Sequence, residues 1–270
     1  MSIFSFGFMQ RALVAGLLVG LVCAVLSVYI VLRRMAFVGH GIGHASFGGV
    51  ALGVLAGINT TFMALVFCVA TAVAIGLVSQ RKHVSEDSAI GIFLVAAMAL
   101  GVLFISLKKT FVDVEGFLFG NILAVSHSDI IFIIVITVIV LGLVALFFKE
   151  LFYFSFDEEM AAVSGIPVTF IRFMLLILIA LTVVVAIKVV GVILVSALLV
   201  IPAVCATQLT LDFKAVMGIS ILVGLIANFG GLLFSYYLNA PSGATIVLVL
   251  FGLFLLTYGF RGVKEILQSR

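Results

Sequence analysis

The sequence predicts an all-α integral membrane protein that crosses the bilayer many times. Of its 270 residues, 65% are hydrophobic and only 9% are charged, and the mean hydropathy is +1.49. A soluble domain of this size needs more charge than that to cover its surface. Apolar runs long enough to cross a bilayer recur along the whole chain, so we expect residues 1–270 to form a single transmembrane domain.

The charge balance and the cysteines exclude several classes of protein. The net charge of +3 comes without a basic block, which argues against a nucleic-acid-binding protein. Cys23, Cys68 and Cys205 all lie in apolar runs, so they form neither C-x-x-C metal pairs nor a disulfide framework. We expect them to be small packing residues.

We expect about nine membrane spans, because each span needs about 20 mainly apolar residues. The first run is too long for a signal peptide and is followed by Arg33 and Arg34, so it is interpreted as a span. The second run is the shortest and the richest in glycine. The expected spans are 12–32, 40–57, 60–79, 87–107, 129–148, 168–188, 190–211, 214–237 and 242–260.

The distribution of lysine and arginine predicts an outside N-terminus and a cytoplasmic C-terminus. Basic residues near span ends concentrate on the cytoplasmic side of membrane proteins. With the N-terminus outside, only four of the 14 basic residues fall on the outer side, and the other ten fall inside. The outer four are Arg11, Lys108, Lys109 and Lys188.

Residues 111–128 follow the fourth expected span on the predicted outer side. Their apolar part is too short to cross a bilayer and could form a half-helix or a re-entrant piece. Polar residues in this segment and at its end could receive an incoming ion, or they could equally form a solvated rim. These residues are Asp113, Glu115, His127 and Asp129.

Glycines in and around the second expected span follow two series with a spacing of four residues. Small residues at this spacing allow helix backbones to approach closely in lipid. We therefore expect the second span to be a buried helix that is packed on all sides. The glycines concerned are Gly39, Gly43, Gly49, Gly53 and Gly57.

His40 and His44 stand at the start of the same span. Residues four apart share one face of a helix, so both imidazoles can point at the same place. Imidazole binds zinc and other divalent first-row metal ions, and an ionisable group in a span is usually paired, coordinated or facing a cavity. The pair therefore predicts a metal contact, with structural packing as the alternative.

The same histidine spacing occurs in the H-E-x-x-H motif of metalloproteases, where the glutamate is the general base. In HGIGH, Gly41 takes the place of that glutamate, which favours carriage of a metal ion over hydrolysis. Two histidines are too few for a closed structural site, and this favours transient binding during passage. Two chains related by a two-fold axis could bring four imidazoles together.

A short helix that does not cross the membrane is expected at about 157–165, between the fifth and sixth spans. Asp157 can cap its start, and Gly165 and Pro167 can end it. The helix is either an ordinary loop helix or a rigid peg that docks in a groove of a cytoplasmic partner. The residues expected to serve such docking are Asp157, Glu158, Glu159, Met160, Ala161 and Gly165.

Three further features complete the sequence pattern. The chain contains no G-x-x-x-x-G-K-[ST] loop, so ATP-driven transport would need a separate ATPase. Pro202 is expected to kink the seventh span. Lys188, at the end of the sixth span, is expected to extend its ammonium group to the membrane interface.

Five blocks together resemble the zinc/manganese permease family of ABC importers over nearly the whole chain. Each block alone is a weak signal, whereas all five in this order are specific. The blocks are LRRMAFVGHGIGHASFGGVALG (32–53), DVEGFLFGNILAVS (113–126), FDEEMAAVSGIPV (156–168), KVVGVILVSALLVIPAVCAT (188–207) and GGLLFSYYLNAPSGATIVL (230–248).

The resemblance implies an architecture similar to that of the vitamin B12 importer permease, in a plasma or inner membrane of bacterial type. It implies cytoplasmic ABC ATPase subunits, a second permease copy or paralogue, and an extracytoplasmic metal-binding protein. It also implies that the helix at 157–165 is the coupling helix. The family usually has histidine at the position of His44 but often has aspartate at that of His40. An imidazole in place of a carboxylate favours zinc over manganese.

The expected function is that of a permease subunit, not an enzyme, in an ATP-driven importer of Zn²⁺, or of Mn²⁺ or Fe²⁺. No permanently bound cofactor is expected. A secondary metal carrier without an ATPase is one alternative, although the cytoplasmic helix and the five blocks argue against it. A membrane-embedded metalloenzyme is another, and the missing glutamate argues against it. Within the ABC class, a metal-chelate or vitamin permease is a third alternative.

Overall fold

The structure is a computed structural model that describes residues 7–80, 84–108, 120 and 125–268. Within those ranges every regular element is a helix, so the predicted all-α fold is confirmed. The helices are α1 (Gly7–Leu32), α2 (Val38–Ala56), α3 (Thr60–Ser79), α4 (Glu86–Lys108), α6 (His127–Leu146), α7 (Phe148–Phe156), α8 (Glu158–Val163), α9 (Val168–Leu198), α10 (Ile201–Leu209), α11 (Phe213–Leu238) and α12 (Ser242–Gln268).

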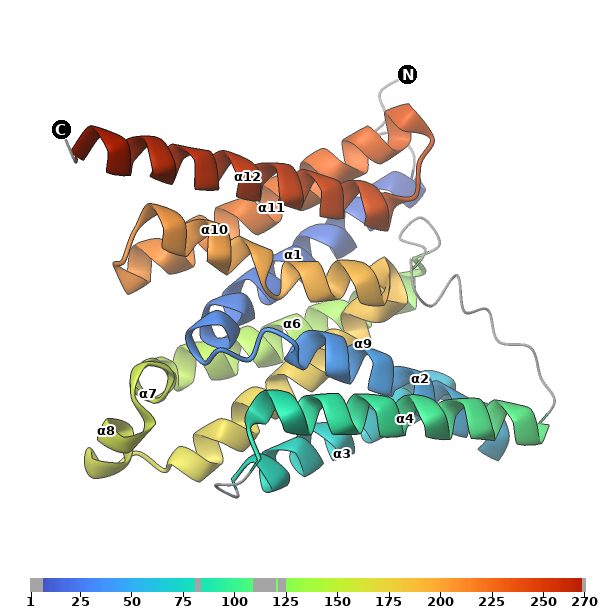
Figure 1. The fold of residues 1–270 in the computed structure, drawn as a ribbon. Helices are drawn as coiled ribbons and strands as arrows, with labels where there is room; N and C mark the ends of the chain where they lie inside the picture. The colour runs from blue at the N-terminus through green and yellow to red at the C-terminus, as the bar shows by residue number, and fades with distance from the viewer. Residues whose placement is uncertain (1–6, 81–83, 109–119, 121–124, 269–270) are drawn as a thin grey trace.

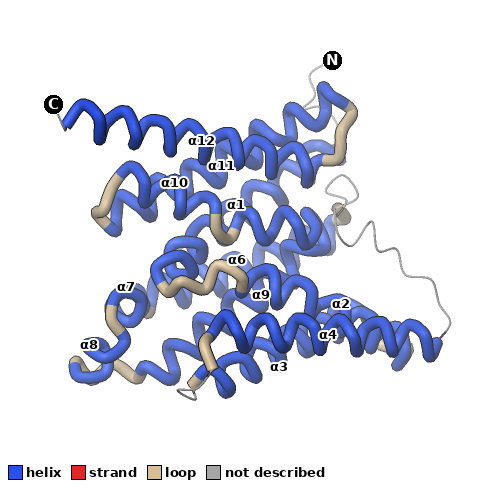
Figure 2. The backbone as a smooth tube through the Cα atoms, in the orientation of Figure 1, coloured by secondary structure: helices blue, strands red, loops and turns tan. Residues whose placement is uncertain are grey.

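The long helices form one bundle with three groups (Figure 1). Helices α2, α3 and α4 pack together on one side, and α10, α11 and α12 pack together on the other. Helices α1, α6 and α9 lie between these groups. The short helices α7 and α8 lie at the end of the bundle where α1 ends and α9 begins. Most of the described connections between helices are short, as Figure 2 shows.

Side-chain caps set the start of several of the described long helices. Asn59 accepts a hydrogen bond from a backbone N–H in the first turn of α3, and Asp212 does the same in α11. Ser126 and Asp129 form a reciprocal capping box at the start of α6. Each cap satisfies a backbone N–H that has no partner within the helix, which an apolar environment would otherwise penalise.

Within the described ranges, seven helical stretches are long and apolar enough to cross a membrane, by length and composition, against about nine expected. Helix α2 is not among the seven, because its glycines and histidines lower its hydropathy. Residues Val168–Leu209 count as one stretch of 42 residues, where two spans were expected. That length is about twice what a single span needs.

The long stretch is broken at two places. Gly191 has φ 79° and ψ 165°, which interrupts the helical geometry inside α9. Figure 1 shows that α9 changes direction along its length. A second break follows Leu198, and Pro202 then stands in the first turn of α10. Proline is tolerated there because the N–H it lacks would have no partner within the helix.

Helix α2 packs very closely against its neighbours through glycine. A Cβ atom added to Gly49 would lie 2.6 Å from the Cα of Ala64 in α3, and one added to Gly39 would lie 2.5 Å from the Leu199 side chain. Such a distance leaves no room for a methyl group, so the backbones depend on glycine for their approach. Gly43 and Gly53 have similar but looser contacts at 3.0 Å.

The prediction that α2 is packed on all sides is wrong on one side. His40 is exposed and His44 is half-buried, while most of the helix is buried. The assignment of Gly57 to helix packing is also wrong. A Cβ there would meet nothing within 4 Å, and the residue instead caps the C-terminus of α2 with φ 70°. Glycine adopts this left-handed conformation without steric cost.

Candidate metal pathway and cytoplasmic helix

The two histidine rings of α2 lie against each other. Their ring centroids are 4.4 Å apart, and the ring planes meet at 74°. The helical spacing of four residues places both imidazoles on one face, as the sequence predicts. His40 is exposed and His44 is half-buried, so the pair opens to the outside of the single chain.

The neighbours of α2 approach it on its other faces. Gly41 faces α4, and a Cβ atom added to it would lie 2.4 Å from the side chain of Ile90. Gly43 faces α9, and a Cβ atom added to it would lie 3.0 Å from the side chain of Val192. These contacts hold α2 between α4 and α9 and leave the histidine face accessible at His40.

The histidines do not form a complete metal site within one chain. Among the residues that the structure describes, there is no group of three or more His, Cys, Asp or Glu side chains that could hold a metal ion. Two imidazoles leave several coordination positions of a divalent ion to other ligands. Any further ligands would come from water, from another chain or from outside the described ranges.

The four outer candidates fall into two groups. Asp113 and Glu115 lie outside the described residues. His127 is the first residue of α6, and Asp129 stands two positions further on. The Asp129 carboxylate accepts hydrogen bonds from both the N–H and the hydroxyl of Ser126. It also accepts one from the Lys188 ammonium group at 2.5 Å. Lys188 therefore pairs with a carboxylate, an interaction that its place at the end of a span does not predict.

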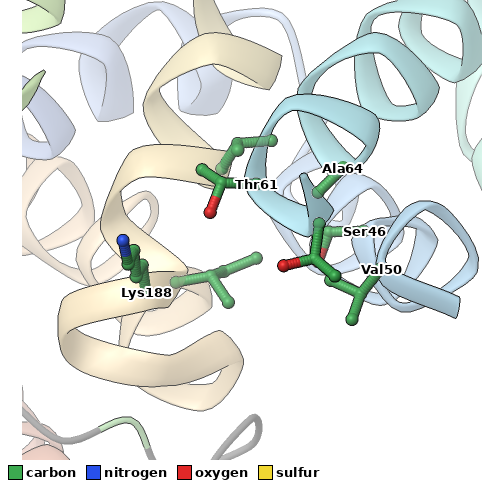
Figure 3. A pocket seen from close by; sticks show the side chains of 8 residues that line it. Ser46, Val50, Thr61, Ala64 and Lys188 are labelled. Carbon is green, nitrogen blue, oxygen red and sulfur yellow. The ribbon is translucent and has the colours of Figure 1, made fainter. Parts of the chain in front are cut away.

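A cavity of about 220 Å³ lies between α2, α3 and α9 (Figure 3). The figure shows Ser46 and Val50 of α2, Thr61 and Ala64 of α3, and Lys188 of α9 around it. Neither histidine lines this cavity. The cavity and the histidine pair therefore lie on different faces of the same helix.

The six-residue helix α8 stands at the end of the bundle with strong local caps. The Asp157 side chain accepts hydrogen bonds from the N–H groups of Glu159 at 2.9 Å and Met160 at 3.0 Å. Gly165 ends the helix with φ 81°. The Met160 and Val163 side chains are 61% and 85% exposed, so α8 presents an apolar face to its surroundings. Ala161, in contrast, is fully buried and faces the permease itself.

Sequence reasoning missed a cluster of four charged side chains that joins α8 to the bundle. We call Arg33, Glu86, Glu158 and Arg172 the charge cluster. Arg33 Nη2 lies 2.8 Å from Glu158 and 3.3 Å from Glu86. Arg172 also pairs with Glu158, and its Nε lies 3.9 Å from Glu86. The two partners of each hydrogen bond in the cluster are 14 to 125 positions apart in the sequence, so no local spacing predicts these contacts.

Comparison with known proteins identifies the family. Residues 5–261 match the model of the ABC 3 transport family. The chain is 38% identical over 265 residues to the "Manganese transport system membrane protein MntC" of Listeria innocua, covering 98% of this chain and 95% of that one. It is 33% identical over 262 residues to a "Probable iron transport system membrane protein" of Haemophilus influenzae, covering 96% of each.

A solved structure supports the same assignment. The chain superposes on a chain of "PsaBC from Streptococcus pneumoniae in complex with Fab" with a TM-score of 0.83 and 35% identity, covering 95% of this chain and 92% of that one. The resemblance seen in the sequence blocks is confirmed, and so is the prediction of a transport subunit rather than an enzyme. The chain belongs to the ABC 3 transport family and is a multi-pass membrane permease of that family.

Proposed function

We propose that this chain is the membrane-spanning permease subunit of an ATP-driven importer of a divalent transition metal ion. The observation that carries the proposal is the pair of imidazoles in edge-to-face contact on the open face of α2, with ring centroids 4.4 Å apart, in a permease of this family. The relatives named above are described as manganese and iron transport proteins, which supports a bare metal ion as cargo.

The choice between manganese and zinc rests on two arguments that point in different directions. The relative from Listeria innocua is named for manganese, and this favours Mn²⁺ as the physiological cargo. The chemistry of the His40–His44 pair favours zinc, because imidazole binds Zn²⁺ more tightly than Mn²⁺. We propose Mn²⁺ as the cargo and Zn²⁺ as an ion that competes for the same pair of ligands.

The binding proposed here is transient. One chain supplies two imidazoles, and a site that must release its ion needs incomplete or weak coordination. A second permease copy placed across a two-fold axis would supply two more imidazoles, since His40 is exposed on the single chain. Gly41 stands where a metalloprotease has its general base, so the pair is suited to carriage rather than hydrolysis.

The partners follow from the two ends of the molecule. We propose that α8 is the coupling helix, and that its exposed Met160 and Val163 dock in a groove of a cytoplasmic ABC ATPase subunit. The N-terminus then lies outside and the C-terminus in the cytoplasm, in agreement with the distribution of basic residues. At the outer end, His127 and Asp129 would face an extracytoplasmic metal-binding protein.

The test is metal uptake by cells that carry either the wild type or the double variant His40→Ala, His44→Ala, at matched levels in the membrane. Uptake of radioactive Mn²⁺ and Zn²⁺ is measured separately. Loss of uptake of one or both ions supports the transit site and identifies the cargo. Unchanged uptake of both ions would show that the pair is a packing feature.

A matched control lies on the same helix. Ser46 stands two positions after His44 and lines the cavity on another face of α2, where its hydroxyl donates to the Gly43 carbonyl at 2.7 Å. The Ser46→Ala variant removes a polar group from α2 without touching the histidine face. It should import both ions at the wild-type rate.

A further inference from the structure

The charge cluster connects α8 with three of the bundle helices at one point. Glu158 is the first residue of α8, and its two carboxylate oxygens accept from different arginines. Arg33 follows the last residue of α1, and Arg172 lies near the start of α9. Glu86, the first residue of α4, contacts both arginines. Two positive and two negative side chains make the cluster neutral as a unit.

The cluster is largely withdrawn from solvent. The side chains of Arg33 and Arg172 are 13% and 12% exposed, and those of Glu86 and Glu158 are 20% and 32% exposed. The Arg33 guanidinium also lies 4.2 Å from the centre of the Phe154 ring and donates to the Phe154 carbonyl at 3.4 Å. An unpaired charge in such surroundings is costly, because a charge that is withdrawn from water loses its hydration. We therefore expect the four side chains to stay paired when the helices that carry them move.

Both ends of the cluster are attached to rigid backbone. Helix α8 ends in a Schellman motif, in which the Ile166 N–H donates to the Ala161 carbonyl at 3.1 Å. Helix α1 ends in the same way, with the Met35 N–H donating to the Ile30 carbonyl at 3.0 Å and Arg34 in the left-handed conformation at φ 58°. Arg33 therefore stands on a fixed helix end rather than on a free loop.

Two short routes lead from the cluster to the histidine helix. Along the chain, Arg33 is followed by the buried Met35 and then by α2, which begins at Val38. Across the bundle, Glu86 begins α4, and Ile90 one turn later packs directly against Gly41 of α2. Gly41 is adjacent to His40. A displacement of α8 thus reaches the start of α2 through both α1 and α4.

We propose that Glu158 is a positioning residue that links movement of α8 to movement of the His40–His44 face of α2, acting through Arg33, Glu86 and Arg172. This inference rests on the proposed function, because it assumes an ATPase that acts on α8. In this role Glu158 contacts neither the metal ion nor ATP. It makes the short helix and the starts of α2, α4 and α9 respond as one unit.

The test uses the permease assembled with its ATPase subunits in proteoliposomes, and measures Mn²⁺ uptake and ATP hydrolysis in the same preparation. In Glu158→Gln we expect uptake to fall about tenfold, because the amide removes the negative charge between the two arginines and leaves only one oxygen to accept from them. ATP hydrolysis and co-purification of the ATPase should stay within about twofold of the wild type, because both Glu158 oxygens are engaged by arginines of the permease and the proposed docking face consists of Met160 and Val163. The number of ATP molecules hydrolysed per ion imported should therefore rise.

Two matched variants separate linkage from folding. Asp87→Asn removes a carboxylate next to Glu86, in the same first turn of α4, from a residue that takes no part in the contacts of the charge cluster. It should keep the wild-type ratio of ATP to ions. The double variant Glu158→Gln, Arg172→Gln should import no less than the Glu158→Gln single variant, because both changes break the same link.

Two results would overturn the inference. The first is unchanged uptake in Glu158→Gln, and the second is a fall of uptake and ATP hydrolysis in the same proportion, which would indicate damage to assembly. If Glu158→Gln does not reach the membrane, Glu86→Gln gives the same test through the α4 route alone. Failure of the wild type to bind an ATPase or to import either ion would instead disprove the proposed function.

Discussion

The charge cluster and the His40–His44 pair differ in how far their interactions are completed within one chain. In the charge cluster, Glu158 accepts from both arginines and the four charges sum to zero, so the group is complete in charge, although the Nε atoms of Arg33 and Arg172 make no hydrogen bond. On α2, His40 and His44 contact each other at 4.4 Å, but one ring is exposed. A completed group stabilises the fold that contains it. An incomplete group retains capacity for a ligand.

The largest expected effect is on the completed group. Arg33→Met should lower the free energy of unfolding by about 3 kcal/mol, because it leaves Glu86 and Glu158 with less positive charge while they stay partly buried. The measurement is the midpoint of thermal unfolding of the purified permease. The neighbouring variant Arg34→Met is the control, since Arg34 is exposed. Equal midpoints for the two variants would mean that the charge cluster contributes nothing specific.

A second prediction concerns the glycine contacts that hold the histidine face open. Gly49→Ala should lower the free energy of unfolding by about 1–3 kcal/mol, because the new methyl group would lie 2.6 Å from the backbone of Ala64. Gly91→Ala in α4 is the matched control, since a Cβ there meets nothing within 4 Å. It should be neutral or stabilising by up to about 1 kcal/mol. A stable Gly49→Ala protein would contradict the close approach of α2 and α3.

The third prediction is smaller and concerns the end of the molecule where α6 begins. Asp129→Asn removes the ion pair with Lys188, whose side chain is half exposed, so the cost should not exceed about 1 kcal/mol. The difference from the wild type should shrink at about 1 M salt, where the screening length is only about 3 Å. Thermal midpoints at low and high salt provide the measurement. A difference that does not change with salt would point to the capping box with Ser126 instead.

Sequence reasoning succeeded where short-range rules apply. The glycine spacing of α2, the Asp157 cap and the Gly165 stop all depend on residues within a few positions of one another. It also placed a boundary between the expected spans 168–188 and 190–211, and the helical geometry is broken close to that boundary, at Gly191. Lys188, at the end of the first of these spans, marked the boundary.

The charge cluster was missed because it follows no short-range rule. Arg33 was interpreted only as a basic residue that follows the first span, and Glu158 only as a residue that could dock on a cytoplasmic partner. Their contact joins positions 125 residues apart, and no spacing in the sequence encodes it. The histidine pair was found because both rings lie on one turn, but ligands from another molecule leave no pattern in this sequence.

The smallest expected effect on stability is also the most informative about function. The double variant His40→Ala, His44→Ala should unfold within about 0.5 kcal/mol of the wild type, because the rings lie on the open face and fill no core position. Added Mn²⁺ or Zn²⁺ should raise the thermal midpoint of the wild-type protein, since an ion that binds only the folded state stabilises it. The double variant should show no such rise.

Each result that differs from these two expectations, on stability and on the response to the ion, has its own explanation. Equal stabilisation of both proteins by the ion would place the binding residues elsewhere, with His127 and Asp129 as the next candidates. A large loss of stability without the ion would make the pair a packing feature like the charge cluster. A rise that depends on protein concentration would indicate that the ion is held between two chains, because only an association equilibrium shifts with concentration. The free energy of unfolding and the change of the thermal midpoint with added ion therefore together distinguish a group whose interactions are complete within one chain from a group that binds a ligand.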